Sequence, residues 1–150
     1  MFHMVRSFIS LICKKNLPHI FLSQEERKRI GGTLFIEFQY CKMKPGTRIQ
    51  DLMPEDGIDC WLDDSLYVYI GDVDIFIKEY ENIFNRGIYC NDNNHKLEHG
   101  LELYGATYYS PDEVGTITAE ILESKATDYE ILIDWLKKVK NYNGFYISGI

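Results

Sequence analysis

Three helix starts of the same kind divide this 150-residue sequence and restrict the folds open to it. In each, a Ser or Thr precedes a Glu by three residues, so the hydroxyl can accept from the Glu backbone N–H while the Glu carboxylate accepts in return. These capping boxes are Ser23–Glu26, Ser110–Glu113 and Thr127–Glu130. Because proline is favoured at the first helical position, Pro111 strengthens the second box, and we expect its helix to run to about Ser124.

Two further helical segments follow from apolar spacing. After Thr127, apolar residues recur on one helical face, and the helix should end near Asn141–Gly144. A fourth helix is expected to begin at Asp72, whose carboxylate can cap it, and to stop near Gly87. Its inward side chains would be Val73, Phe76, Ile77, Tyr80 and Phe84.

Short segments rich in β-branched and aromatic residues lie between these helices and predict strands. They are Thr33–Cys41, Cys60–Leu62, Leu66–Ile70, Leu103–Tyr109 and Phe145–Ile147, with Asp63-Asp64-Ser65 as a hairpin turn between the second and third. No linker-like stretch divides the chain. We therefore expect one α+β domain over residues 1–150, with a mostly antiparallel sheet of about five strands covered by about four helices.

Charge is distributed unevenly along the chain, whose formal net charge is −7. Residues 1–48 hold nine Lys or Arg and three Asp or Glu, whereas residues 49–150 hold seven and twenty. The segment Ile49–Ile77 carries eight carboxylates and no Lys or Arg. Such a body repels nucleic-acid phosphates and attracts basic proteins, so we expect a protein partner and no direct nucleic-acid ligand.

The expected partner-binding face gathers most of these acids with two tyrosines. Turn chemistry explains some of the acids, since Asp hydrogen-bonds to its own backbone and solvates loops. Tyr67 and Tyr69 should point to one face of their strand, beside the acidic turn. The predicted partner-binding residues are Asp59, Asp63, Asp64, Tyr67, Tyr69, Asp72 and Asp74.

The sequence patterns that would indicate a metal site, an enzyme or a cofactor site are weaker. Cys90, His95 and His99 have a spacing that could supply three zinc ligands, but no second Cys or His lies near them, and we predict no metal. An enzyme using His95 or His99 as base with Glu98 stays open as an alternative, although no catalytic signature is present. The pair Gly31-Gly32 precedes a strand and so does not form a phosphate-binding loop, and no cofactor is expected. The four cysteines contain no C-x-x-C pair and are expected to be buried free thiols.

The apolar run Phe8–Cys13 is the only place where a targeting signal could lie. It is short, is interrupted by Ser10, and is followed by Lys14-Lys15 and not by a small-residue cleavage site. No run approaches the ~18 apolar residues that a membrane-spanning helix needs. We expect a cytoplasmic protein without membrane contact.

The segment Gly87–Val114, preceded by Tyr80–Phe84, resembles immunity proteins of bacterial contact-dependent growth inhibition (CDI) systems, in particular those paired with ribonuclease toxins. Its most distinctive piece is Gly100-Leu-Glu-Leu-Tyr-Gly-Ala-Thr-Tyr-Tyr-Ser-Pro111. The resemblance implies a cytoplasmic, non-catalytic protein that binds one-to-one to the C-terminal nuclease domain of a cognate toxin. It assigns no binding residues, because such families vary in fold and contact surface.

The leading hypothesis is thus an immunity protein that covers the basic active-site cleft of a toxin nuclease. The alternatives are a small hydrolase or transferase centred on His95, Glu98 and His99, and an acidic regulatory adaptor of an endogenous basic protein. The oligomeric state stays open. So does the role of the basic N-terminal third, which could dock a partner or pack against the acids.

Overall fold

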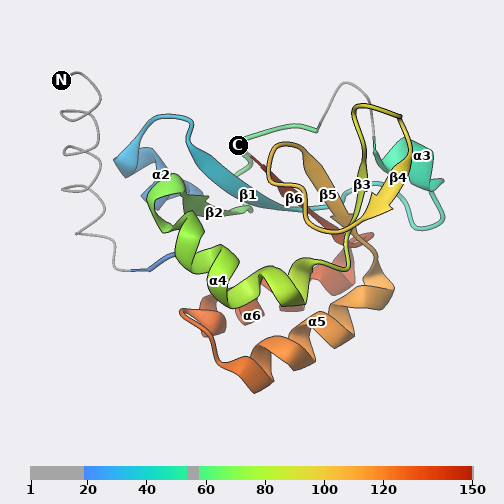
Figure 1. Ribbon diagram of the computed structural model, residues 1–150. Helices are drawn as coiled ribbons and strands as arrows, with labels where there is room; N and C mark the ends of the chain where they lie inside the picture. Colours follow the sequence, from blue (N-terminus) through green and yellow to red (C-terminus); the bar gives the residue numbers. More distant parts are fainter. Residues whose placement is uncertain (1–18, 54–57, 150) are drawn as a thin grey trace.

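The strands pair into one antiparallel sheet in the computed structural model, which describes residues 19–53 and 58–149. Within that part of the chain the sheet has six strands in the order β2-β1-β6-β5-β3-β4, and the α+β prediction is confirmed (Figure 1). The strands are β1 Phe35–Tyr40, β2 Leu66–Tyr69, β3 Ile88–Cys90, β4 Leu97–His99, β5 Ala106–Tyr109 and β6 Phe145–Ser148.

The helices lie mainly on one face of this sheet. Figure 1 shows α4, α5 and α6 together below it, while α2 and α3 lie toward opposite ends. Their bounds are α2 Gln24–Ile30, α3 Ile49–Leu52, α4 Val73–Phe84, α5 Pro111–Ser124 and α6 Tyr129–Lys137, with short 3-10 helices η1 Ile70–Asp72 and η2 Lys138–Asn141. None of the helices in the described ranges is both long and apolar enough to span a membrane.

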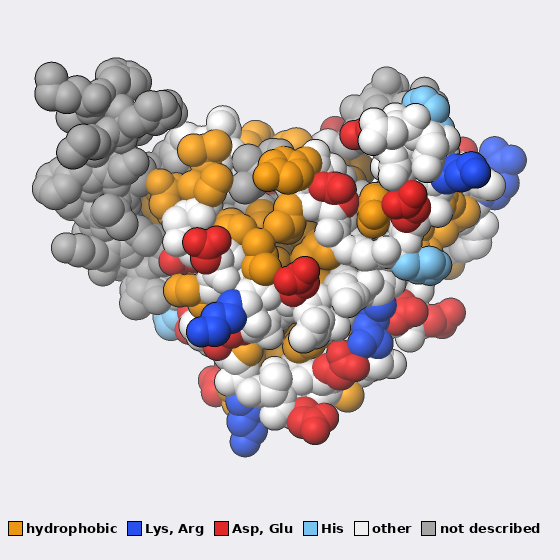
Figure 2. Space-filling model, in the orientation of Figure 1, with side chains coloured by type: hydrophobic (Ala, Val, Ile, Leu, Met, Phe, Trp, Pro, Cys, Tyr) orange, Lys and Arg blue, Asp and Glu red, His pale blue; other side chains and the backbone are white. Residues whose placement is uncertain are grey.

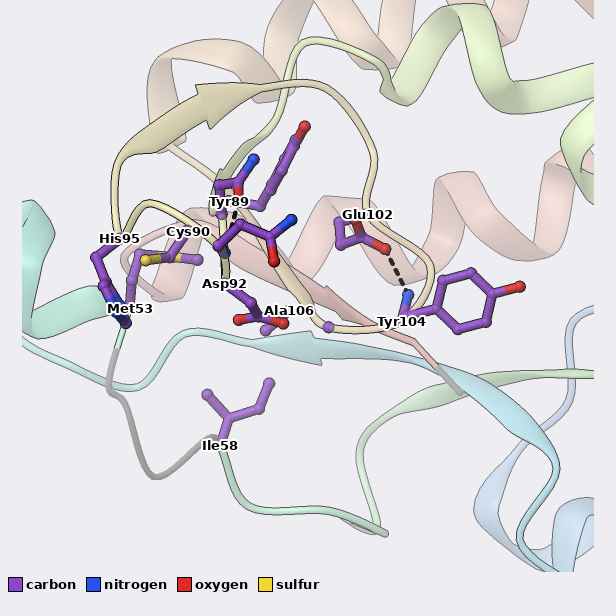
Figure 3. Close-up of a pocket in the computed structure, with 12 residues that line it drawn as sticks. Met53, Ile58, Tyr89, Cys90, Asp92, His95, Glu102, Tyr104 and Ala106 are labelled. Carbon is purple, nitrogen blue, oxygen red and sulfur yellow. Dashed lines mark hydrogen bonds between the residues drawn. The ribbon is translucent and has the colours of Figure 1, made fainter.

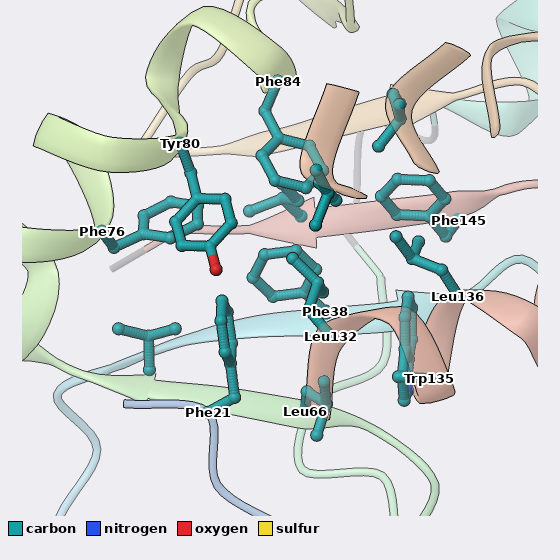
Figure 4. Packing of buried hydrophobic residues seen from close by; sticks show 14 of the residues in the cluster. Phe21, Phe38, Leu66, Phe76, Tyr80, Phe84, Leu132, Trp135, Leu136 and Phe145 are labelled. Atoms are coloured by element: carbon teal, nitrogen blue, oxygen red, sulfur yellow. The ribbon is translucent and has the colours of Figure 1, made fainter. Parts of the chain in front are cut away.

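Aromatic rings fill the space between the sheet and the helices (Figure 4). The ring of Phe38 on β1 lies at the centre, edge-on to Phe76 and Phe84 of α4 and to Trp135 of α6, with centroids 5.6–5.9 Å apart. Edge-to-face pairs of this kind stabilise the fold beyond the apolar area they bury. This core fixes β1 relative to the helices.

Strand β1 is buried on both faces along its whole length. Successive side chains of a strand alternate between faces, so Ile36, Phe38 and Tyr40 enter the aromatic core. Phe35, Glu37 and Gln39 therefore point to the opposite face, which a loop between α3 and β2 covers together with α2. Two polar side chains are thus buried on the face that carries no long helix.

The capping boxes have three different outcomes. At Ser23 both reciprocal hydrogen bonds form, at 3.2 and 3.1 Å. The Ser110 helix has the predicted bounds but shows no side-chain cap bond among the described atoms. The third prediction is wrong by one residue, because Asp128, with φ 56°, is the N-cap of α6. Its carboxylate accepts from the Ile20 backbone N–H at 2.8 Å, a tertiary contact that the local pattern does not contain.

The helix expected at Asp72 is confirmed as α4, which ends at Phe84, and four of its five expected inward residues are buried. The Asp72 carboxylate makes no cap hydrogen bond within α4. Four predicted strands correspond to β1, β2, β5 and β6; the first three are shorter than expected, and β6 extends one residue further, to Ser148.

One predicted strand and one predicted hairpin are wrong, and two strands of the sheet were not predicted. Cys60–Leu62 is not a strand, so Asp63–Ser65 is a turn without a hairpin; the backbone there bonds to side chains of other elements. Strands β3 and β4 were not expected, because each has three residues with no fully buried side chain and so no periodic apolar signal. The Phe8–Cys13 run and two carboxylates of the acidic segment, Glu55 and Asp56, lie outside the described residues.

Candidate functional site

A buried carboxylate on β1 organises the acidic loop, which we define as residues 59–64. Glu37 is 4% exposed, and its Oε1 accepts from the Trp61 N–H at 2.8 Å. Its Oε2 accepts from the Leu62 N–H at 3.1 Å and from Ser65 Oγ at 2.7 Å. A buried carboxylate without such donors would be costly, so Glu37 and the loop backbone satisfy each other.

Side chains from four elements bind carbonyl oxygens of the same loop. They are Gln39 Nε2 to Asp59, Gln24 Nε2 to Trp61 (2.6 Å), Tyr67 Oη to Leu62 (2.6 Å) and Trp135 Nε1 to Asp64 (2.9 Å). Since the donors come from β1, α2, β2 and α6, the loop backbone is held on several sides. The acidic loop is therefore a fixed surface on the sheet.

Trp61 lies at the middle of the loop in the left-handed region, with φ 62°. Such a backbone is unfavourable for a bulky residue and persists where surrounding contacts hold it. The indole stacks on Tyr67 at a 17° interplanar angle, and the Arg27 guanidinium lies 4.5 Å from its ring centroid. The basic N-terminal third thus contributes directly to the packing of the acidic loop.

Not all the loop carboxylates are equally available. Asp64 pairs with Lys42 Nζ at 2.9 Å, and Asp51, before the loop, pairs with Arg48 at 3.2 Å. Asp59 and Asp63 are exposed and enter no ion pair with any residue in the described ranges. Part of the N-terminal positive charge is consequently used within the molecule, and Asp59 and Asp63 are the carboxylates that face outward unneutralised.

The two tyrosines proposed for partner contact share one face of β2, as expected, but they differ in accessibility. Tyr67 is 0% exposed, so its prediction as a contact residue is corrected: its ring packs against Phe35 and Trp61, and its hydroxyl bonds within the loop. Burial raises the pKa of Tyr67 above its usual range, with the Glu37 charge acting in the same direction. Tyr69 is half-buried.

Asp72 and Asp74 lie at the other end of β2, at the start of α4. The four residues of β2 rise about 3.3 Å each, which separates these two acids from the acidic loop by roughly 13 Å along the strand. Carboxylates at this position also favour the positive end of the helix dipole. The predicted acids thus form two groups, of which Asp74 is exposed and Asp72 half-buried.

The structure does not bring together the residues of the enzyme alternative. Glu98 and His99 are neighbours on β4 and so point to opposite faces, while His95 lies in the preceding turn with φ 57°. Hydrogen bonds from Asn91 and then Tyr89, both at 3.0 Å, lower the pKa of Glu98. No group of three His, Cys, Asp or Glu suited to a metal occurs in the part of the chain that the structure describes.

The described cysteines are free thiols, as expected, although only Cys41 is buried; Cys60 is exposed and Cys90 is half-buried. Partial desolvation of the sulfur by its neighbours, then the charges of Glu37 and Asp59, raise the pKa of the Cys60 thiol. Cys60 lies in the acidic loop, and Cys90 lies on β3. A probe attached to Cys60 would therefore report on the acidic loop, and one attached to Cys90 on β3.

Two features of this region were not expected from the sequence. One is the set of polar anchors Gln24, Glu37 and Gln39. Glu37 and Gln39 alternate with apolar residues in Phe35-Ile-Glu-Phe-Gln-Tyr40, whereas Gln24 has no such signal. The other is an open hollow of about 680 Å³ between β3, the turn after it and the loop before β5 (Figure 3). Its walls are formed by residues far apart in sequence, so no local motif marks it.

Comparison of the chain with protein-family models, with curated proteins and with solved structures gives no match.

Proposed function

We propose that this chain is an immunity-type protein that binds and neutralises the nuclease domain of a toxin, with a ribonuclease as the preferred partner. The observation that carries the proposal is the acidic loop, a fixed backbone that presents Asp59 and Asp63 outward. The segment that resembles CDI immunity proteins supports the same function. In this role the protein acts in the cytoplasm, where it meets the incoming toxin.

The physical basis is complementarity with a nucleic-acid-binding cleft. A nuclease must expose Lys and Arg side chains to bind phosphates, and carboxylates on a fixed loop can pair with the same side chains. Because the loop is already ordered, binding costs little conformational entropy. Electrostatic steering raises the association rate, toward ~10⁸ M⁻¹s⁻¹ at low salt.

The predicted residues have distinct parts in this proposal. Asp59 and Asp63 make the direct charge contacts, and Tyr69 with Asp74 extends the surface along the edge strand β2. Asp64 contributes less, because Lys42 already neutralises it at 2.9 Å. Tyr67 is buried and contributes indirectly, because its ring stacks on Trp61 and its hydroxyl donates to the Leu62 carbonyl oxygen.

The proposal expects a toxin gene beside the gene for this chain, and the test is reconstitution with the nuclease domain that such a neighbouring gene encodes. We expect a stoichiometric one-to-one complex on size-exclusion chromatography, and loss of RNA degradation when the chain is present in slight excess over the nuclease. A nuclease that stays fully active at saturating chain, or that does not bind it, contradicts the proposal.

The adaptor alternative uses the same surface and differs only in its partner. Under that alternative the neighbouring nuclease would not bind, while a basic cellular protein would be captured through Asp59 and Asp63. The enzyme alternative gains no support from the geometry, because His95, Glu98 and His99 do not converge.

A further inference from the structure

A second surface, separate from the acidic loop, has the composition of a binding site for cationic side chains. It is the hollow of about 680 Å³ that Figure 3 shows between β3 and the loop that precedes β5. Two carboxylates, Asp92 and Glu102, line it together with Tyr89 and Tyr104. Among the described residues that line it there is no Lys or Arg. Its charge is thus opposite to that of a basic partner.

Tyr104 is the strongest sign that this surface binds another molecule. Its side chain is 85% exposed, well above the other exposed large hydrophobic residues of the described chain. Tyrosines anchor protein interfaces, because they bring a large contact area with few rotatable bonds. Figure 2 shows hydrophobic side chains gathered on the face that Figure 1 views, with carboxylates around them.

Two sides of the hollow, formed by the turn after β3 and by the loop before β5, are held in place without a ligand. On one side, the backbone of Asn91 pairs with Lys96 and His95 at 2.8 Å, and the Asn91 side chain accepts from Asn93 N–H at 2.9 Å. On the other, Glu102 Oε1 accepts from the Tyr104 N–H at 2.8 Å, and the Glu102 N–H donates to Thr107 Oγ1 at 2.9 Å. Because these two sides are formed in advance, they lose little entropy on binding.

The dimensions and chemistry suit an arginine-bearing loop. The volume lies within the range of pockets that enclose a ligand of several side-chain sizes. A guanidinium can bond to carboxylates through its fixed fork of N–H groups and stack on an aromatic face, and its methylene stem can lie on aliphatic atoms such as those of Met53 and Ile58. A lysine matches this geometry less well, because its ammonium is a point charge.

We propose that this hollow, lined by Asp92, Glu102 and Tyr104, accepts an arginine-bearing loop of the partner protein as a second anchor beside the acidic loop. The choice of partner rests on the proposed function, whereas the preference for arginine rests on the hollow itself. The two can therefore fail separately.

The test uses the full chain and a capped peptide, Gly-Arg-Arg-Gly, titrated into the ¹⁵N-labelled protein and followed by amide chemical shifts. We expect shifts concentrated in residues 91–95 and 102–106. The same peptide with citrulline in place of arginine keeps the shape and removes the charge, and it should bind at least about fivefold more weakly. Equal binding of the two peptides, or no shifts in these residues, overturns the proposal.

A double variant, Asp92→Asn with Glu102→Gln, supplies the complementary measurement. The Gln side-chain oxygen can still accept from the Tyr104 N–H, so the wall should persist while the charge is lost. We expect roughly tenfold weaker binding of the arginine peptide, with Glu123→Gln on the remote part of α5 unchanged. Wild-type affinity in the double variant contradicts the proposal, and should that variant not fold, the citrulline comparison decides.

Two further outcomes separate this inference from the proposed function. If the neighbouring nuclease does not bind but the arginine peptide does, the hollow stands and the immunity function fails. If the nuclease binds with unchanged affinity to the double variant, the function stands and the hollow is not part of its interface.

Discussion

At the scale of single residues, Glu37 connects the sheet to the proposed binding surface. It is the only buried carboxylate of β1, and both of its oxygens accept hydrogen bonds from the stretch between Trp61 and Ser65. The sequence marks it only as a Glu within an apolar strand. Its partners lie 24 to 28 residues away in the chain, so their positions could not be predicted without the pairing of β1 with β2.

Replacing this carboxylate by its neutral isostere tests its role. In Glu37→Gln an NH₂ group replaces one of the two carboxylate oxygens, so at least one of the donors in the loop loses its acceptor. We therefore expect the free energy of unfolding to fall by about 1–3 kcal/mol. Urea denaturation measures the change. Glu123→Gln, exposed near the end of α5, is the matched control and should change stability by less than about 0.5 kcal/mol; equal effects of the two substitutions would exclude a special role for Glu37.

The second prediction at this scale concerns the titration of Glu98. Hydrogen bonds from Asn91 and Tyr89 favour the charged carboxylate, so its pKa lies below the ordinary value. Because the folded pKa is lowered, the stabilisation is present above the unfolded-state pKa and is lost as the pH falls through the folded one. In Tyr89→Phe the pKa of Glu98 should rise, which a ¹³C carboxyl titration measures; an unchanged value would mean that the Tyr89 hydroxyl does not act on Glu98.

At the scale of elements, local signals predicted the helices better than the strands. The Ser110–Glu113 pattern with Pro111 gave the start of α5, because an N-cap residue and an N1 proline are read from adjacent residues. Strands β3 and β4 could not be predicted in this way. They form because Ile88 and Tyr89 pair with β4 in a hairpin and also with β5, while their own three residues carry no periodic apolar pattern.

Two glycines provide a matched test of these elements. Gly144, before β6, has φ 83°, and an added Cβ would lie 2.1 Å from the Tyr109 carbonyl oxygen. Gly144→Ala should therefore destabilise the protein by about 2 kcal/mol or more. Gly115, inside α5, has open space around it, and Gly115→Ala should stabilise the protein by about 0.5–1 kcal/mol. Thermal unfolding measures both, and changes of the same sign would contradict this assignment.

At the scale of the whole molecule, the sheet separates two different layers. One face packs on α4, α5 and α6 through an aromatic core, and the other carries the acidic loop on polar anchors. The charge asymmetry of the sequence predicted an acidic surface, but it could not show that Lys42 neutralises Asp64 or that β2 separates Asp72 and Asp74 from the loop. The candidate site is therefore narrower than the sequence suggested, with Asp59 and Asp63 at its centre.

The rate of association between this chain and the neighbouring nuclease domain, measured by stopped-flow fluorescence, tests the central claim most directly. At about 50 mM salt, Asp59→Asn with Asp63→Asn should slow association roughly tenfold and weaken its salt dependence. Asp134→Asn, an exposed acid on α6, should leave the rate unchanged. If the double variant associates as fast as the wild type and with the same affinity, the acidic loop is not the binding surface.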